Sequence, residues 1–242
     1  MLDVIFRSCV SCMAVHQPER GRVTGTDKLE VTRRCYRSLV ASLTRLPADS
    51  WRLWIIDDSV GADRQWWADA GLWVPDHFRE LRGQGNLASL AACYALADLQ
   101  CHDLIYFVED DYLHVPEAME EAVTVAENAR IGHLRSGAFL CDYPNAYLPQ
   151  APIHALIGHG RYRHWIRVRQ TTGSFLIHAE QFKAHRAFFA KFAETAIEAG
   201  SVNEVWKSVP CLSPIPTLTW HLQIPETISP VLDWRPTWEA YK

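Results

Sequence analysis

Two groups of consecutive acidic residues stand out in the sequence, and each follows an apolar stretch. Asp57 and Asp58 come directly after residues 53–56, and Glu109-Asp110-Asp111 comes directly after residues 104–108. Carboxylates packed together repel one another unless a cation offsets their charge. A hard divalent cation, held by one or two carboxylates and by substrate phosphates, would do so. The residue types therefore predict metal-assisted chemistry on a phosphorylated substrate, although Asp57 and Asp58 alone are equally consistent with a turn or a helix cap.

Three apolar stretches predict buried strands, because strands of a parallel sheet are covered on both faces. The first is Leu2–Ser8, and the other two precede the acidic groups. Residues 27–46, with Asp27 as N-cap, and residues 86–99 have the apolar spacing of helices. Strands alternating with helices indicate an α/β fold with a mostly parallel sheet flanked by helices. Ligands of such sheets bind beyond the carboxyl ends of the strands, where both acidic groups fall.

The second half of the chain is less regular. We expect a strand at Gly173–Ile177 and a helix over residues 179–198. From Cys211 onward the chain is rich in proline, which predicts an extended tail that wraps the body. A length of 242 residues suits one continuous core, so a single domain over residues 1–242 is expected.

The composition is that of a globular protein with a formal net charge of −4. It argues against nucleic-acid binding as the main function, which needs a large basic surface. No apolar run is long enough to span a bilayer, so we expect no transmembrane segment, while peripheral membrane contact stays open. The seven scattered cysteines do not resemble a disulfide framework, and we expect reduced, mostly buried thiols and a cytoplasmic location.

Motifs of several other classes are missing from the sequence. It has no phosphate-binding P-loop, no complete Gly-x-Gly-x-x-Gly and no Gly-x-Ser-x-Gly elbow. Cys9 and Cys12, with His16 nearby, lack the second pair of ligands that a zinc site needs. These absences leave the acidic strand ends as the best candidates for chemistry.

With these motifs in place, the first half of the chain resembles the GT-A glycosyltransferases, especially those of family 2. The resemblance is carried by the order of strands and helices, by Ile56-Asp57-Asp58-Ser59, and by Glu109-Asp110-Asp111 at the position of the family's Asp-x-Asp motif. The resemblance covers residues 1–125 well and the rest of the chain patchily. It implies a GT-A-like fold in which residues 1–125 bind a nucleotide-sugar and a metal, and residues 126–242 bind the acceptor.

The resemblance implies a metal-dependent glycosyltransferase. The donor would be a nucleotide-diphosphate sugar, expected to be UDP-linked, with Mn²⁺ or Mg²⁺ as the cofactor. The acceptor would be a glycan, a lipid-linked compound or another hydroxyl compound. One alternative is a nucleotidyltransferase that makes sugar nucleotides, which would need a glycine-rich basic loop after the first strand. Another is a non-catalytic sugar-binding or nucleotide-binding module.

The resemblance also assigns roles to the acidic motif. Asp111 is expected to be the direct metal ligand, with Glu109 as a second ligand and Asp110 nearer the ribose. His221 fits the late histidine that several GT-A enzymes supply to the metal. The apolar residues on both sides of His221 are equally consistent with a histidine of the core.

Binding of the nucleotide is expected around the carboxyl ends of the first strands. The resemblance places Asp58 against the base, with Asp57 beside it. Four further residues are expected near the donor, namely Arg7, Ser8, Asn86 and Ser89.

The acceptor half holds the candidates for the remaining chemistry. An inverting transfer needs a base within hydrogen-bond reach of the acceptor hydroxyl. The candidate is Glu204, which is equally consistent with a surface residue at a helix start, and Asp142 is its substitute. Trp165 and Trp206 are predicted to stack on sugar rings. The basic run over residues 159–169 is predicted to cover the diphosphate or an anionic acceptor, or else to be a solvated face.

Overall fold

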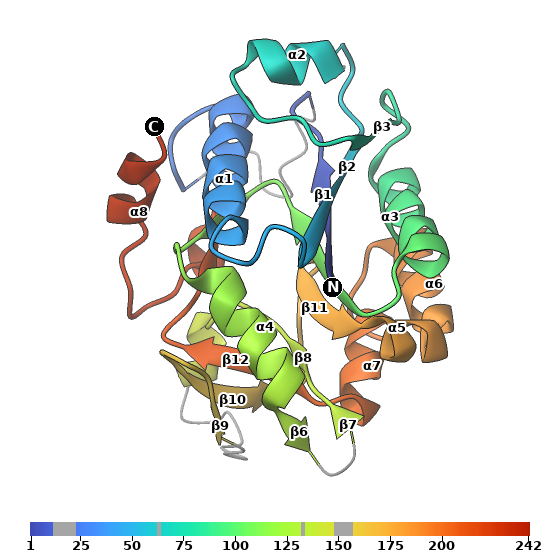
Figure 1. Ribbon diagram of the computed structural model, residues 1–242, viewed down its shortest axis with the longest axis vertical. Coiled ribbons are helices and arrows are strands. Elements are labelled where there is room, and N and C mark those ends of the chain that lie inside the picture. The colour runs from blue at the N-terminus through green and yellow to red at the C-terminus, as the bar shows by residue number, and fades with distance from the viewer. Residues whose placement is uncertain (12–22, 62–63, 132–133, 148–156) are drawn as a thin grey trace.

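The centre of the computed structural model is a mixed sheet (Figure 1). The structure describes residues 1–11, 23–61, 64–131, 134–147 and 157–242. Within these residues the sheet has nine strands, in the order β3 (His77–Glu80), β2 (Trp51–Asp57), β1 (Leu2–Ser8), β4 (Leu104–Glu109), β11 (Phe175–His178), β8 (Gly137–Ala138), β12 (Cys211–Ile215), β10 (His164–Val168) and β9 (Ile157–His159).

The strands β3, β2, β1 and β4 are parallel, so their carboxyl ends lie at one edge of the sheet. The predicted apolar strands form β1, β2 and β4, and each ends within a few residues of its predicted bound. The register pairs Asp57 with Ser8 and Glu109 with Arg7. The two acidic groups therefore flank the end of β1, at the carboxyl edge of the sheet where the sequence predicts them.

Beyond β4 the same sheet is continued by strands from the second half of the chain. Strand β11 runs antiparallel to β4, and the next pair, β8 and β12, is joined in parallel. One sheet thus joins the portion before residue 125 to the portion after it. The predicted α/β fold is confirmed, and the four adjacent parallel strands β3, β2, β1 and β4 come from the first half.

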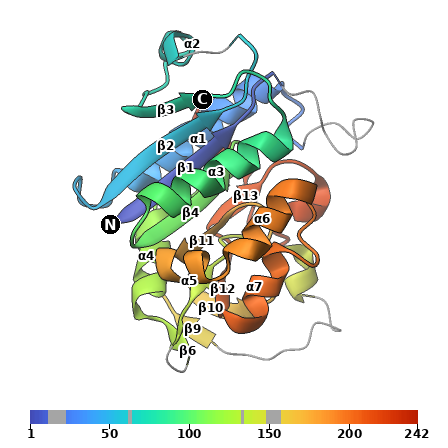
Figure 2. The ribbon, with the colours of Figure 1, turned by 90° about the vertical axis from the view of Figure 1, so that its right-hand side faces the viewer.

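Helices cover both faces of the sheet (Figures 1 and 2). On one face lie α1 (Lys28–Leu43) and α4 (Ala118–Asn128), which pack against each other. On the other face lie α3 (Asn86–Gln100), α5 (Ala179–Ala184), α6 (Arg186–Thr195) and α7 (Val202–Ser208). The short helices α2 (Arg64–Asp69) and α8 (Arg235–Ala240) lie beyond β3 and beside α1 respectively.

Two short strand pairs stand apart from the main sheet. Strand β13 (Thr219–His221) pairs antiparallel with β5 (Tyr112–His114), and β6 (Arg130–Ile131) pairs with β7 (Leu134–Arg135). Two 3₁₀ turns cover Pro144–Tyr147 and Pro225–Thr227. Strand β5 directly follows the acidic turn after β4, and its pairing with β13 brings residues 219–221 to that turn.

The helices predicted over residues 27–46 and 86–99 are found as α1 and α3. The Asp27 carboxylate accepts the Glu30 N–H at 2.8 Å, so the predicted N-cap of α1 is confirmed. The helix predicted over residues 179–198 divides into α5 and α6 at His185. The His185 ring bonds the carbonyl oxygen of Gln181, which marks the end of α5.

The extended tail predicted from Cys211 onward is wrong. Strand β12 lies inside the sheet between β8 and β10, and Cys211 and Leu212 are fully buried. Further along, α8 packs on α1 through the guanidinium of Arg34, which lies 4.3 Å from the centre of the Trp238 ring. The end of the chain is therefore part of the core despite its prolines, because its apolar residues complete the sheet.

The sugar-stacking prediction for two tryptophans is also wrong. Trp165 and Trp206 are both 0% exposed. Their indole N–H groups donate to Glu121 at 3.1 Å and to Thr171 at 2.8 Å. Both are core residues with satisfied polar atoms, so neither presents a face to a ligand.

The cysteines follow the expectation with one exception. Cys35, Cys93, Cys101, Cys141 and Cys211 are free and buried. Cys9 takes part in a disulfide, so the expectation of reduced thiols is wrong there. Cys12 and His16 lie outside the described residues. Among the described helices, none is both long and apolar enough to cross a membrane.

Candidate metal and donor site

Glu109, Asp111 and His221 form the one group of potential metal ligands found among the described residues. Each offers one ligand atom, and these atoms all lie within 4.8 Å of one another. Glu109 ends β4, Asp111 follows in the turn, and His221 ends β13. Because β13 pairs with β5, His221 lies opposite Tyr112, the residue after Asp111. The pairing of two distant segments therefore brings together the three predicted ligands.

The imidazole of His221 is held on two sides. Its Nδ1 lies 2.9 Å from the Tyr143 hydroxyl, and its ring stacks on Tyr112 with centroids 4.5 Å apart. Its Nε2 lies 3.5 Å from Oδ1 of Asp111. The ring therefore turns Nε2 toward the acidic residues.

Glu109 is held by a network from three other elements. Its backbone N–H donates to the Ser174 hydroxyl at 3.0 Å, and its carboxylate pairs with Arg7 of β1. The same guanidinium donates to Asn86 and, at 3.1 Å, to Ser89. Burial lowers the pKa of Arg7, but the charge of Glu109 and other neighbours raises it more, so the cation persists. The structure thus brings together Arg7, Asn86 and Ser89, all predicted donor residues, around Glu109.

Asp110 points toward β1 and α1. Its carboxylate pairs with the Lys28 ammonium and accepts the Cys9 N–H at 2.9 Å and the Thr32 hydroxyl at 3.3 Å. The Ser8 hydroxyl lies at the longer distance of 3.5 Å. Lys28 therefore offsets the charge of Asp110, while the placement of Asp110 near a ribose stays a prediction.

The acidic pair after β2 organises the neighbouring loops. The two carboxylate oxygens of Asp58 each accept a backbone N–H at 2.7 Å, from Gln84 and Gly85. Gly85 has a φ of 96°, which favours glycine, and it directly precedes α3. The Asp58 carboxylate therefore sets the start of α3 and the position of Asn86.

Asp57 makes equally local contacts. It accepts the Ser59 N–H at 2.6 Å and the indole N–H of Trp67. Burial raises the pKa of Asp57 from the ordinary value of an aspartate. Asp57 and Asp58 lie at the predicted edge of the sheet, and contact with a base stays a prediction for both.

The two candidate bases lie on different elements. The Glu204 carboxylate pairs with Lys207 at 2.6 Å on α7. The neighbouring Asn203 accepts the Thr171 N–H at 2.9 Å, which sets α7 against the segment before β11. Catalysis by Glu204 stays a prediction, since its described partner is Lys207.

Asp142 is almost fully buried. It accepts the Tyr147 hydroxyl and, at 3.1 Å, the Thr217 N–H. Burial raises its pKa despite these hydrogen bonds. The next residue, Tyr143, is the partner of His221, so Asp142 lies on the segment that borders the metal group.

The described part of the basic run has its contacts elsewhere. The backbone N–H groups of Arg161, Tyr162 and Arg163 donate to the buried Glu121 of α4. In the sheet, β11, β8 and β12 separate β10 from β4. These contacts do not connect the run with the acidic residues at the end of β4.

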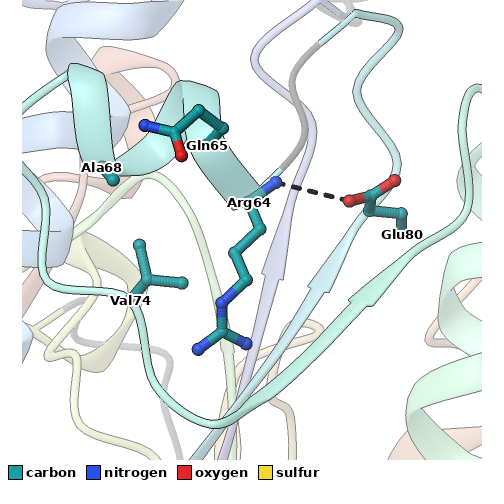
Figure 3. A pocket seen from close by; sticks show the side chains of 5 residues that line it. All are labelled: Arg64, Gln65, Ala68, Val74 and Glu80. Carbon is teal, nitrogen blue, oxygen red and sulfur yellow. Dashed lines mark hydrogen bonds between the residues drawn. The ribbon is translucent and has the colours of Figure 1, made fainter.

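A surface pocket of about 380 Å³ lies between α2 and β3 (Figure 3). Its lining comprises Arg64, Gln65, Ala68, Val74 and Glu80. Strands β2 and β1 lie between β3 and β4 in the sheet. The pocket is therefore separate from the group of Glu109, Asp111 and His221.

Sequence reasoning missed Lys28, Tyr112, Tyr143 and Thr172. Lys28 carried a signal, because it follows the N-cap of a helix that begins near the carboxyl edge of the sheet. Tyr143 lies in a stretch without periodicity, and only the folded chain shows its contact with His221.

The sequence matches no protein-family model and no curated protein. Solved structures do match. TarS from S. aureus is 11% identical with a TM-score of 0.50, over 88% of this chain and 34% of TarS. The 4-diphosphocytidyl-2C-methyl-D-erythritol synthase from Anaerococcus prevotii is 11% identical with a TM-score of 0.48, over 99% of this chain and 95% of the synthase. GlyE from Streptococcus pneumoniae is 10% identical with a TM-score of 0.48, over 99% of this chain and 62% of GlyE.

The likeness to TarS shows the fold. This chain spans about a third of the length of TarS. It has a GT-A-like α/β fold, as the sequence resemblance implied.

Proposed function

We propose that this chain is a metal-dependent glycosyltransferase that uses a nucleotide-diphosphate sugar. The observation that supports the proposal is the convergence of Glu109, Asp111 and His221 at the carboxyl end of β4. In an open α/β sheet this edge is where ligands bind. Two carboxylates and an imidazole, all close together and mostly buried, are a donor set for a divalent cation.

The donor atoms fit Mn²⁺ or Mg²⁺. Carboxylate oxygens are preferred ligands of both metals. Because Nδ1 of His221 bonds Tyr143, Nε2 is the nitrogen on the side of the acidic residues. When bound, the metal would stabilise the negative charge on the departing diphosphate.

The other residues of the site have supporting roles in this proposal. Arg7 holds Glu109 in place and links it to Asn86. Asp58 sets the loop before Asn86 through two backbone hydrogen bonds. These contacts join Arg7, Asp58, Asn86 and Glu109 at the carboxyl edge, where a nucleotide diphosphate would lie with its phosphates toward the metal group.

The base is assigned to one of two carboxylates. Asp142 has a pKa raised by burial, which brings it closer to neutral pH and makes it a better proton acceptor. Glu204 is the alternative, in the first turn of α7. The proposed acceptor is a glycan, a lipid-linked compound or another hydroxyl compound, and the proposed organisation is a single domain over residues 1–242.

The test measures release of nucleotide diphosphate from a panel of nucleotide-sugars with Mn²⁺ or Mg²⁺. UDP-GlcNAc is the first donor to test and UDP is the first product to measure, since TarS 1–349 has been crystallised with each. We expect metal-dependent release in the wild type and loss of it in Asp111→Asn. Asp76→Asn, at a fully exposed position, is the matched control and retains activity.

Other outcomes of that assay would identify the alternatives. Release of pyrophosphate from a nucleoside triphosphate and a sugar phosphate would indicate a nucleotidyltransferase. Tight binding of donor without turnover for any acceptor would indicate a binding module. Equal activity of the wild type and Asp111→Asn would contradict the metal role.

A further inference from the structure

The hydroxyl of Tyr143 makes the hydrogen bond that orients the imidazole of His221. Its oxygen lies 2.9 Å from Nδ1, within the normal range of a hydrogen bond. Tyr143 lies just before the turn at Pro144–Tyr147, far from both β4 and β13 in the sequence. This contact joins segments that are distant in the sequence. It is therefore separate from the pairing of β13 with β5, which positions the backbone of His221.

The bond belongs to a chain of hydroxyl groups. The Tyr143 hydroxyl lies 3.3 Å from that of Tyr112, which in turn bonds the hydroxyl of Thr172. If Nδ1–H of His221 donates to Tyr143, each hydroxyl can donate to the next, and Thr172 accepts the last hydrogen bond. In this direction the chain leaves Nε2 of His221 without a proton, with its lone pair on the side of Asp111.

The last hydroxyl group of this series belongs to Thr172, which lies in a segment that also contacts the candidate metal ligand Glu109. Thr172 is two residues before Ser174, whose hydroxyl accepts the backbone N–H of Glu109. Gly173 lies between them, and a Cβ there would be 3.1 Å from the Glu109 carboxylate. Residues 172–174 thus contact Glu109 directly. They are linked to His221 by the hydrogen bonds of Tyr112 and Tyr143.

We propose that Tyr143 is a positioning residue that sets the orientation and the tautomer of His221 for metal binding. The proposal rests on the metal site described under the proposed function and deepens it. Imidazole ligands commonly donate their second N–H to a fixed acceptor, and loss of that acceptor lowers metal affinity by about 10- to 100-fold. Tyr143 would be that acceptor, and Tyr112 and Thr172 would hold its hydroxyl in the accepting orientation.

The ring of Tyr143 has a packing role that is separate from the hydrogen bond of its hydroxyl, so a substitution can remove one and keep the other. It makes an edge contact with Phe139, with centroids 5.1 Å apart. Tyr143→Phe keeps this contact and removes only the hydroxyl. A second tyrosine–histidine pair supplies the matched control, because the Tyr106 hydroxyl lies 3.0 Å from Nε2 of the buried His114. His114 is not in the metal group, so Tyr106→Phe removes a similar hydrogen bond without touching a ligand.

The experiment measures the Mn²⁺ affinity of the full chain from the electron paramagnetic resonance signal of free Mn²⁺. We expect Tyr143→Phe to weaken binding about tenfold and Tyr106→Phe to leave it unchanged. The variants are then combined with His221→Ala. Because Tyr143 acts through His221, Tyr143→Phe is expected to cause no further loss in the His221→Ala background.

Two results would overturn the inference while leaving the metal site intact. One is wild-type affinity in Tyr143→Phe, and the other is an equal loss from Tyr143→Phe in both backgrounds. A wild type that binds no Mn²⁺ would instead overturn the metal site and the inference with it. The wild-type titration therefore separates failure of the inference from failure of the proposed function.

Discussion

Lys28, the first residue of α1, forms an ion pair with Asp110, which lies between the acidic ligand candidates Glu109 and Asp111. Its ammonium is also 3.9 Å from a carboxylate oxygen of Asp111. On the other side, Arg7 pairs with Glu109. Among the described residues, two cations therefore lie at the acidic turn, and the affinity for the proposed metal would depend on the balance of these charges.

Replacing Lys28 should strengthen metal binding while weakening the metal-free fold. Lys28→Met leaves the charge of Asp110 without its ammonium, so we expect Mn²⁺ to bind about tenfold more tightly. The melting temperature without metal should fall, because like charges then lie together. Calorimetric titration and thermal unfolding with and without Mn²⁺ measure both effects. The control is Lys242→Met, at an exposed position, and weaker Mn²⁺ binding by Lys28→Met would contradict the account.

A side chain at position 173 should disturb the metal group. In Gly173→Ala, the new Cβ would lie 3.1 Å from three atoms of the Glu109 carboxylate, which is tighter than an ordinary contact. Since Arg7 and Ser174 hold Glu109, we expect about a tenfold loss of Mn²⁺ affinity with little loss of fold. Titration with Mn²⁺ and thermal unfolding of the same samples separate the two effects. Unchanged affinity would contradict the expectation that a displaced Glu109 carboxylate weakens metal binding.

The buried carboxylate of Glu121 should be important for stability and not for metal binding. It accepts three backbone N–H groups of residues 161–163 and the indole N–H of Trp165. In Gly160→Ala the Cβ would lie 1.8 Å from this carboxylate, so we expect a loss of about 1–3 kcal/mol in the free energy of unfolding. Urea unfolding measures the loss, with Mn²⁺ affinity as the property that should not change. A Gly160→Ala protein as stable as the wild type would contradict the packing described around Glu121.

The buried His114 should make stability depend on pH. Burial lowers its pKa from 6.5 to about 3. Between those values the unfolded chain binds a proton that the folded chain does not, so stability falls as pH decreases from about 6.5 toward 3. The slope from this residue is at most about 1.4 kcal/mol per pH unit.

Comparison with His114→Gln isolates this contribution. Asp57 and Asp142, whose pKa values burial raises, act in the opposite sense at low pH and are common to both proteins. The difference in unfolding free energy between wild type and His114→Gln should therefore change steadily between pH 6.5 and 4. A difference independent of pH would show that His114 is protonated in the folded state.

The first half of the fold is readable from the sequence because its signals are local. Continuous apolar runs predict β1, β2 and β4, and the carboxylate of Asp27 predicts the start of α1. Beyond residue 125 the fold depends on contacts between distant segments, which local sequence patterns do not reveal. Pro214 argues against an interior strand, yet β12 lies inside the sheet with Pro214 opposite Trp165.

The candidate site divides in the same way. Glu109 and Asp111 are recognisable from their place after a strand, and the family resemblance points to His221. Tyr143 and Lys28 carry no comparable motif, since each acts through a contact between distant segments. The tryptophans show the same limit, because a count of aromatic residues does not reveal that Trp165 is buried.

A crystal structure of the protein with UDP and Mn²⁺ tests the central claim most directly, because the anomalous signal of manganese locates the metal independently of any assay. The account predicts a single strong signal between Glu109, Asp111 and Nε2 of His221, with the diphosphate of UDP on the same metal. Manganese bound elsewhere, or UDP bound in the pocket between α2 and β3 with no metal at these three residues, would contradict it.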